Sequence, residues 1–463
     1  MKRDSWTRLA SCCAAAVTLW LARPAAADDP VIKFERYRLE NGLEVILHQD
    51  NRVPLVAVDV WYHVGSGDET PGRSGFAHLF EHMLFQGSKH VGDDRHFEVL
   101  KKIGASAVNG STNTDRTNYF EVVPSHQLET ALWLESDRMG YLLPKLTDAS
   151  FHNQVDVVRN ERRQNYDNVP YGRARFAVAE GLYPEGHPYR YLTIGRHEDL
   201  TAATVADVTA FYRKWYAPGN ATLVLAGDFD TATARQLVQK WFGSFPRTER
   251  PAHHAPPVPT ISRTRREVVD PFARLRRIEY EWHSPAFYAP GDAELDILAE
   301  ALAAPGTGRL YKILVHQKQL AQSVAAYQAS QQFSSFFAVS VLAKTDADLA
   351  AIERIIDEEI DRVRKEPITK REFDRSVINR EAGFVWGLEE LLARAERLQA
   401  YNHYVGRPDF ITGDLDRYRT SSPEKVLAAA KKYLDQRRVE VLTTPGAPGS
   451  APTAPAAAPA KGN

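Results

Sequence analysis

The chain is almost without cysteine. Of its 463 residues only Cys12 and Cys13 are cysteine, and both lie within the first thirty positions. If that N-terminal segment is removed, the mature chain has no thiol. Its stability cannot then depend on disulfides, and a metal site must be built from His, Asp or Glu.

The sequence also lacks an excess of charge of either sign. Its 58 Lys and Arg residues balance 59 Asp and Glu residues, which gives a formal charge of −1. A dedicated nucleic-acid binder needs a basic surface, so we expect no nucleic-acid partner. With 43% hydrophobic and 25% charged residues, the composition is that of a folded protein of roughly two to three domains.

No apolar run is long enough for a permanent membrane anchor. Lys2 and Arg3 precede an apolar run over 9–22, and small residues at 25–27 follow it. This pattern predicts a signal peptide over 1–27, because the run falls short of the roughly 18 to 20 residues that span a bilayer. We therefore expect export across the inner membrane, to the periplasm.

Helical and strand-like segments are mixed along the chain. Residues 34–48 predict a hairpin that turns through Asn41-Gly42, and residues 106–123 are also strand-like. Helical periodicity covers 75–85, with Gly87 just past its end, and returns over 127–142. There is no regular βαβ alternation, so the pattern predicts an α+β protein.

Two distant segments are similar to each other. Residues 204–225 and 423–442 each run from a helical pattern into a short apolar strand. Such an internal repeat predicts two similarly built domains. The predicted division is 28–246 for the first domain, 247–261 for a linker rich in Pro and His, 262–445 for the second domain and 446–463 for a disordered tail.

The segment that indicates chemistry is His-Leu-Phe-Glu-His at 78–82. On a helix, His78 and His82 lie one above the other and Glu81 lies on the same side. Two neutral imidazoles in this arrangement can bind one divalent ion, and zinc suits such ligands. A neighbouring carboxylate that does not bind the ion can take a proton from metal-bound water. The order is the reverse of the commoner H-E-x-x-H.

The alternative is that both histidines are core residues and Glu81 is a solvated charge. With 15 His in the chain, the pattern arises by chance on the order of a few per cent of the time, so we favour the metal site. A metal-storage module would not need Glu81 beside the ligands. Spacing alone leaves the third ligand open among Glu98, Glu121, Glu135 and Glu161.

Several motifs together resemble the pitrilysin (insulinase) family of inverzincin metallopeptidases. The motifs that support this resemblance lie at 65–69, 75–87, 157–161 and 211–221. The most similar members are half-length ones, such as mitochondrial processing peptidase and bacterial relatives. The resemblance implies two similarly folded domains, each a mostly antiparallel mixed β-sheet packed with α-helices.

The resemblance also implies the roles of individual residues. One zinc ion per chain would be held by His78, His82 and Glu161, with Glu81 as the general base. The family often has a second glutamate seven residues before the third ligand, where this chain has Gln154. An amide in that place can orient a ligand by hydrogen bonding but supplies no charge.

Residues 107–121 resemble the family's edge strand beside the zinc, along which an extended substrate lies. Main-chain hydrogen bonding to an edge accepts many sequences, which fits a peptidase that acts on peptides or unfolded polypeptide. An ordinary sheet strand with a polar turn is the alternative for each residue singly. We expect Asn109 to contact the substrate.

The chain departs from the family at Val315 and Gln322. Active members have an arginine and a tyrosine there, which stabilise the developing oxyanion. We therefore expect a zinc-dependent endopeptidase that is the catalytic zinc subunit of a heterodimer, whose second half-length subunit supplies the missing pair. A homodimer is the alternative assembly. The alternative function is a non-catalytic core or scaffold subunit of a larger assembly.

Overall fold

The computed structural model describes residues 29–253 and 255–446. The predicted signal peptide lies outside the described residues, and so does the predicted tail apart from Gly446. Among the described residues, no helix combines the length and the apolar character that crossing a membrane requires.

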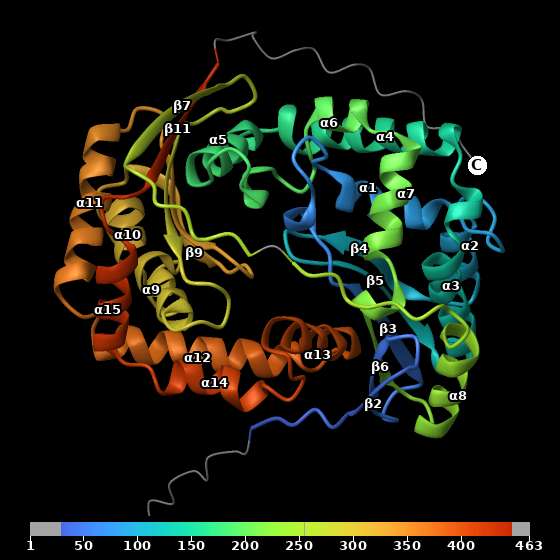
Figure 1. Ribbon diagram of the computed structural model, residues 1–463. Coiled ribbons are helices and arrows are strands. Elements are labelled where there is room, and N and C mark those ends of the chain that lie inside the picture. Colours follow the sequence, from blue (N-terminus) through green and yellow to red (C-terminus); the bar gives the residue numbers. More distant parts are fainter. Residues whose placement is uncertain (1–28, 254, 447–463) are drawn as a thin grey trace, which may run out of the picture.

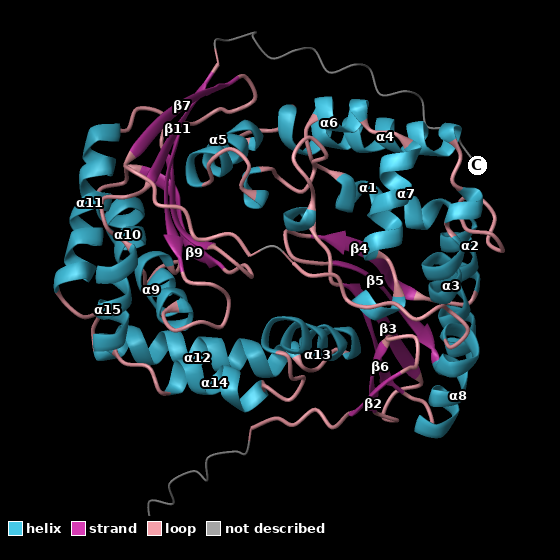
Figure 2. Cartoon of the chain, viewed as in Figure 1, coloured by secondary structure: helices cyan, strands magenta, loops and turns pink. Residues whose placement is uncertain are grey.

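The chain builds two β-sheets, which Figures 1 and 2 show on opposite sides of the molecule. The first has the order β1-β2-β6-β3-β5-β4, with strands β1 (Glu35–Arg38), β2 (Glu44–Gln49), β3 (Leu55–Tyr62), β4 (Ser106–Thr112), β5 (Thr117–Pro124) and β6 (Ala221–Gly227). The second has the order β7-β11-β8-β10-β9, with strands β7 (Thr264–Asp270), β8 (Arg277–Ser284), β9 (Ala321–Ala329), β10 (Ser335–Ala343) and β11 (Val439–Pro445).

The strands of the two sheets are paired in the same way. In the first, β6 pairs parallel with β2 and antiparallel with β3. In the second, β11 pairs parallel with β7 and antiparallel with β8. The strands β6 and β11 end the two segments that are similar in sequence. The predicted α+β class with two similarly folded domains is therefore confirmed, while the exact domain boundaries stay a prediction.

Fifteen helices accompany the sheets in the described part of the chain. In the first half they are α1 (Phe76–Gln86), α2 (Arg95–Lys102), α3 (Leu128–Tyr141), α4 (Asp148–Arg162), α5 (Gly172–Leu182), α6 (His197–Ala202), α7 (Val205–Trp215) and α8 (Thr231–Phe242). In the second half they are α9 (Asp292–Ala303), α10 (Arg309–Tyr311), α11 (Leu349–Lys365), α12 (Lys370–Gly387), α13 (Leu391–Val405), α14 (Ile411–Arg419) and α15 (Pro423–Tyr433).

One helix from each half of the chain packs on the sheet of the other half. Helix α13 packs through Leu398 and Tyr401 on β2, β3 and β6 of the first sheet. Helix α5 packs through Val178 and Leu182 on β11 of the second sheet. The two apolar contacts bury sheet faces that would otherwise meet water, so they stabilise the two domains against each other.

Asp115 joins the two domains at the turn between β4 and β5. Its buried carboxylate accepts hydrogen bonds from the hydroxyls of Tyr189 (2.5 Å) and Tyr404 (3.2 Å). It also accepts from the backbone N–H of Gln332 (3.0 Å), in the turn between β9 and β10. The two hairpin tips therefore meet at one carboxylate, which fixes where the edge strands of both sheets end.

Candidate metal centre and active site

Helix α1 carries the His-Leu-Phe-Glu-His segment and begins after a left-handed turn. Its preceding residue, Gly75, has φ of 91°, a value that favours glycine. The carboxylate of Glu69 accepts hydrogen bonds from the backbone N–H groups of Gly75 (2.9 Å) and Ala77 (2.8 Å). Burial nevertheless raises the pKa of Glu69 to about 8. The predicted helix, closed by Gly87, is confirmed.

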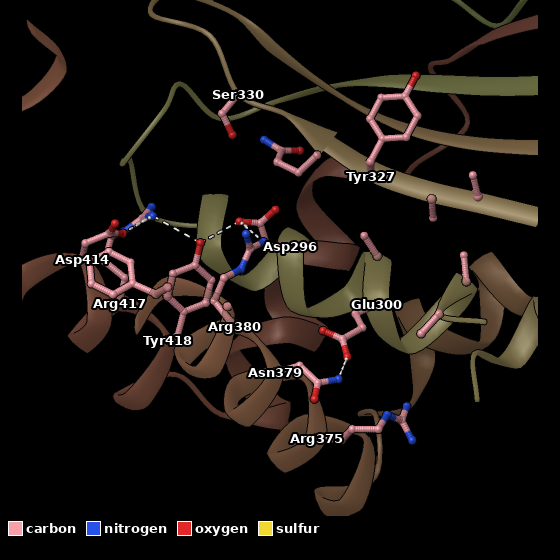
Figure 3. Close-up of a pocket in the computed structure, with 18 of the residues that line it drawn as sticks. Asp296, Glu300, Tyr327, Ser330, Arg375, Asn379, Arg380, Asp414, Arg417 and Tyr418 are labelled. Carbon is pink, nitrogen blue, oxygen red and sulfur yellow. Dashed lines mark hydrogen bonds and ion pairs between the residues drawn. The ribbon is translucent and has the colours of Figure 1, made fainter. Parts of the chain in front are cut away.

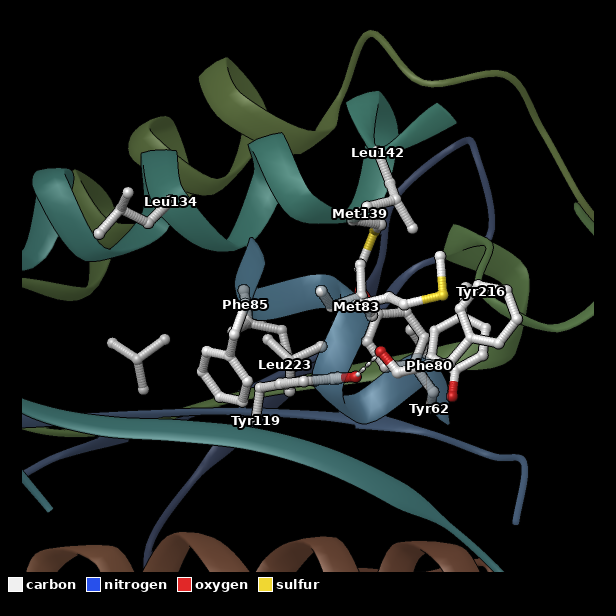
Figure 4. Packing of buried hydrophobic residues seen from close by; sticks show 14 of the residues in the cluster. Tyr62, Phe80, Met83, Phe85, Tyr119, Leu134, Met139, Leu142, Tyr216 and Leu223 are labelled. Carbon is white, nitrogen blue, oxygen red and sulfur yellow. Dashed lines mark hydrogen bonds between the residues drawn. The ribbon is translucent and has the colours of Figure 1, made fainter. Parts of the chain in front are cut away.

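The apolar side of α1 faces the core of the first domain (Figure 4). Phe80 and Met83 are buried there among aromatic and aliphatic side chains. The hydroxyl of Tyr119, on β5, donates to the carbonyl oxygen of Phe80 (3.2 Å), and that of Tyr216 donates to Ala77 (3.4 Å). Core packing and these two hydrogen bonds fix the rotation of the helix, so its polar side projects away from the core.

The polar side of α1 meets α4 at three side chains that could ligate a metal ion. Nε2 of His82 lies 3.1 Å from Oε2 of Glu161, and Nε2 of His78 lies 3.6 Å from the same oxygen. One donor atom from each residue falls within 4.8 Å of the other two. Tetrahedral zinc, with bonds of about 2.0 to 2.1 Å, holds its ligand atoms about 3.3 Å apart, so this set fits one such ion.

The protonation states also suit a cation. Burial lowers the pKa of His78 to about 4, which keeps its imidazole neutral and its lone pair available. The pKa of Glu161 is lowered, first by its hydrogen bond with His82, so its carboxylate is ionised. Nδ1 of His78 is buried and has no hydrogen-bond partner among the described residues. The site therefore offers the neutral imidazole of His78 and the anionic carboxylate of Glu161.

Glu81 stands beside these three residues and is held from the edge strand. The hydroxyl of Thr112, on β4, donates to Oε2 of Glu81 (2.6 Å). Burial raises the pKa of Glu81. A Cβ at Gly110 of the same strand would lie 3.1 Å from Cγ of Glu81, so strand and helix are in close contact. Glu81 is thus placed between the metal-ligating atoms and the edge of the sheet.

Only one of the four acidic candidates reaches the histidines. Glu98 is on α2 and pairs with Arg95 (3.0 Å). Glu121 and Glu135 are fully buried beside Arg138, in the core of the first domain. Sequence spacing could not separate these carboxylates from Glu161, because the contact between α4 and α1 is made only in the folded chain.

The remaining predicted residues lie as follows. Asn109 is exposed on the edge strand β4, where its side-chain oxygen accepts from the backbone N–H of Gly110 (2.9 Å). Gln154 is buried on α4 and makes no hydrogen bond to Nδ1 of His78. Val315 is partly buried in a helical turn over 312–317, and Gln322 is exposed on β9.

Sequence reasoning missed Thr112 and Glu69 as residues that position the site. Both lie within or beside motifs that it singled out, at 65–69 and 107–121. A polar residue beside a motif was a weak signal, because many polar residues in such segments only face water. The hydrogen bonds to Glu81 and to the start of α1 give these two residues their importance.

Comparison with known proteins places the chain in one class, the M16 peptidases. The family model described as "Insulinase (Peptidase family M16)" matches residues 44–177, and the one described as "Peptidase M16 inactive domain" matches 202–379. Zinc protease PqqE of Helicobacter pylori is 30% identical over 77% of this chain and 80% of that protein. The chain belongs to peptidase family M16, the insulinase family.

Solved structures agree with this assignment. A protease from Helicobacter pylori covers 90% of this chain and all of its own, with a TM-score of 0.84 and 27% identity. The periplasmic protease PqqL from Escherichia coli covers 90% of this chain with a TM-score of 0.75 and 18% identity, but only 48% of its own length. This chain spans about half the length of PqqL, and the likeness to PqqL concerns the fold alone.

Proposed function

We propose that the protein is a zinc-dependent endopeptidase that cleaves peptides or unfolded polypeptide segments. The observation that carries the proposal is the cluster of donor atoms from His78, His82 and Glu161 within 4.8 Å, with Glu81 beside it. Three protein ligands leave one position of a tetrahedral ion for water or substrate, as catalytic zinc sites require. The name of the relative PqqE, a zinc protease, supports the same metal.

The roles of the chain's own residues follow from their places. When bound, zinc would polarise the scissile carbonyl and lower the pKa of a water molecule to about 7. Glu81 would accept the proton of the attacking water and deliver it to the leaving amine nitrogen. The hydroxyl of Thr112 would hold the carboxylate of Glu81 in the orientation that this transfer needs.

The substrate would lie along the exposed edge of β4. This strand pairs only with β5 among the described residues, so its outer backbone groups are available to an extended peptide. A register shift between Ser106 and Asn109 places a bulge there, and Ala107 has φ of 51°. Bulges beside active sites commonly redirect neighbouring side chains, which supports a role for Asn109 in contacting the substrate.

The chain would act as the zinc-bearing subunit of a pair. Val315 and Gln322 stand where the family pattern has an arginine and a tyrosine. Valine has no hydrogen-bond donor to replace the arginine, and glutamine has only an amide in place of the phenol. PqqL is about twice as long as this chain, which supports a second half-length unit, whether a different subunit or a second copy.

Export to the periplasm is part of the same proposal. It is supported by the N-terminal sequence and by the periplasmic location named for PqqL.

A non-catalytic scaffold subunit is the second candidate function. It is favoured by Val315 and Gln322, and by a structural relative from Pseudomonas fluorescens that is described as a "peptidase M16 inactive domain". That relative is 19% identical, so its likeness extends to the fold alone. The complete set of ligating residues and the placement of Glu81 favour the peptidase.

The deciding experiment measures cleavage of an unstructured fluorogenic peptide, together with the zinc content of the protein. Parent protein should lose activity with a chelator and recover it with zinc. Glu81→Gln should keep the metal and lose nearly all turnover, whereas the control Glu98→Gln should behave as the parent. Full activity of Glu81→Gln would exclude the proposed role of Glu81, and chelator-insensitive cleavage would exclude the zinc mechanism.

A further inference from the structure

Helix α13 contacts the first sheet through polar side chains as well as apolar ones (Figure 1). The amide of Gln399, near the middle of the contact, donates to the backbone carbonyl oxygens of Asp59 and Thr222 (both 2.9 Å). The helix belongs to the second half of the chain, so a change that weakens this contact loosens the two halves from each other. Three buried histidines lie at the two ends of the contact, namely His48, His63 and His403.

His63, just after β3, faces His403 of α13. Their Nδ1 atoms lie 2.7 Å apart, and their rings are stacked with centroids 4.9 Å apart. Only one proton fits between two facing nitrogens, so at least one of the two rings must be neutral. Nε2 of His63 shares a hydrogen bond with the hydroxyl of Thr222 (2.9 Å). Nε2 of His403 is buried without a hydrogen-bond partner among the residues that the structure describes.

The charged groups around this pair are mostly basic. They are Arg38 of β1, Arg116 of the turn between β4 and β5, and Arg250 and His253 of the segment after α8. Glu44 of β2 is an acidic neighbour, but its carboxylate is already bound by Arg36 (2.6 Å) and Asn402 (2.6 Å). Burial lowers the pKa of both His63 and His403 well below the usual value, and the basic neighbours lower it further.

His48 makes the matching contact at the other end of α13. Its Nδ1 donates to the backbone carbonyl oxygen of Lys33 (2.7 Å), and its Nε2 accepts from Nη1 of Arg394 (3.2 Å). Because a guanidinium can only donate, this contact requires a neutral imidazole. Arg394 also pairs with Asp50, which Arg52 binds as well. The pKa of His48 is lowered, first by burial.

Two carboxyl groups in the same contact respond to pH in the opposite direction. Asp59 of β3 is buried, and Glu396 of α13 lies near it. The amide of Asn118 donates to both, at 3.2 Å and 2.8 Å. Burial raises the pKa of each carboxyl group, and Glu396 raises that of Asp59 further. These two groups therefore weaken the contact as pH rises, whereas the three histidines weaken it as pH falls.

On its other side, α13 borders a cavity of about 1220 Å³ in the second domain (Figure 3). Arg397 of α13 lines this cavity and lies nearly opposite Gln399 around the helix. Ion pairs outside α13, such as Arg417 with Asp414 (2.8 Å), hold the cavity wall together. Helix α13 therefore has open space to move into when it leaves the first sheet, while the remaining helices keep their own contacts.

We propose that the contact between α13 and the first sheet is an acid-sensitive switch, which holds the two domains together near neutral pH and releases α13 when His48, His63 and His403 take up protons. Release would expose the face of the first sheet that α13 covers, including Asn118 of β5. The inference goes beyond the proposed peptidase function and depends neither on catalysis nor on a metal ion.

The direction of the effect follows from proton binding. After release each histidine would titrate near its usual pKa of about 6.5, whereas the contact keeps that pKa lower. The histidines therefore impose no penalty above about pH 6.5, and they destabilise the contact as pH falls below that value. Three histidines bind protons on release and two carboxyl groups lose them, so the net response is a weaker contact in acid.

The test measures hydrogen exchange in the full chain between about pH 7.5 and pH 5, with each rate divided by the intrinsic rate at that pH. The chain is measured as purified and again with a chelator, so that loss of a metal ion in acid is recognised. Exchange in α13 should rise at least about tenfold per pH unit below 6.5, and it should fall again on return to neutral pH. Exchange in α9, in the core of the second domain, reports global unfolding and should stay slow.

Variants identify the groups that titrate through the slope of α13 exchange against pH. His48→Gln should reduce the slope by about tenfold per pH unit, and the double variant His63→Gln with His403→Gln should flatten or reverse it. Asp59→Asn imitates the protonated carboxyl group and should make the slope steeper. His126→Gln, at an exposed position after β5, is the control and should keep the slope of the parent. Loss of a merely structural contact would raise exchange equally at every pH.

Three results would overturn the proposal. One is α13 exchange in the parent that does not rise between pH 7.5 and pH 5. Another is the parental slope in both His48→Gln and the double variant; if the double variant does not fold, His48→Gln decides alone. The third is simultaneous loss of protection in α13 and α9, which would mean that acid unfolds the whole protein. Peptidase activity enters none of these measurements, so failure of the proposed function would be recognised separately.

Discussion

The hydroxyl of Thr112 donates a hydrogen bond of 2.6 Å to Oε2 of Glu81, and so joins the edge strand to the helix that carries His78 and His82. Glu81 is partly buried, so its carboxylate has few other partners to orient it. The contact links the strand proposed to bind the substrate with the residue proposed to move its proton.

Replacing Thr112 by valine should reduce kcat by about tenfold and leave the zinc content unchanged. Valine has nearly the same shape but no donor, so the carboxylate of Glu81 loses its orientation while the metal ligands stay in place. Peptide cleavage and metal analysis of the same preparation measure both effects. Thr112→Ser keeps the hydroxyl and should retain most of the activity. Equal loss in the serine and valine variants would contradict this role.

Removing Glu161 should remove the metal. Glu161→Ala and His82→Ala should each lower the zinc bound per chain after dialysis, because two remaining protein ligands hold the ion poorly. Asp156→Asn, on the exposed side of the same helix, is the control and should bind one zinc ion as the parent does. Undiminished zinc binding by Glu161→Ala would mean that another residue is the third ligand.

The carboxyl group of Glu69 should make the stability of the protein depend on pH. Burial raises its pKa from 4.5 to about 8 in the folded state. Below pH 4.5 the group is protonated in both states and imposes no penalty. As pH rises towards 8 the unfolded chain ionises first, so the free energy of unfolding falls by an amount of the order of a few kcal/mol.

Glu69→Gln should remove this part of the pH dependence. Chemical unfolding at several pH values between about 5 and 8, with a chelator present, gives the slope of the free energy of unfolding against pH for the parent and the variant. The variant is expected to be less stable at low pH, because it loses a hydrogen bond to the start of α1, but to have the flatter profile. Parallel profiles would show that Glu69 does not titrate in this range.

Restoring the missing pair should raise the activity of the chain on its own. The double variant Val315→Arg with Gln322→Tyr is expected to cleave peptides at least about tenfold faster than the parent at high protein concentration, where two copies can pair. Ser323→Tyr, beside Gln322 on the same strand, is the control for adding a phenol. An active parent chain that gains nothing from the pair would argue against the need for a second subunit.

Asp115→Asn should loosen the contact between the two domains. The buried carboxylate of Asp115 accepts three hydrogen bonds, and an amide can reproduce only some of them. We expect a loss of about 1 to 3 kcal/mol in the free energy of unfolding. Hydrogen exchange at Gln332 and Tyr189 should rise in the variant, while exchange in the core of β6 should change only with global stability. Unchanged exchange at both residues would contradict this role.

The sequence by itself determined the local elements and the kind of chemistry. Alternation, periodicity and turn residues predicted the first hairpin, helix α1 and the strand-like character of 106–123, because each depends on neighbours within a few positions. The spacing of His78, Glu81 and His82 placed them on one side of a helix for the same reason.

Only the tertiary structure decided which distant residues meet. Spacing left four glutamates equivalent, and the packing of α4 on α1 selected Glu161 among them. The exchange of α5 and α13 between the sheets had no local pattern to indicate it. Such contacts depend on the burial of whole faces far apart in the chain, and the free energy of that burial is not encoded in any short segment.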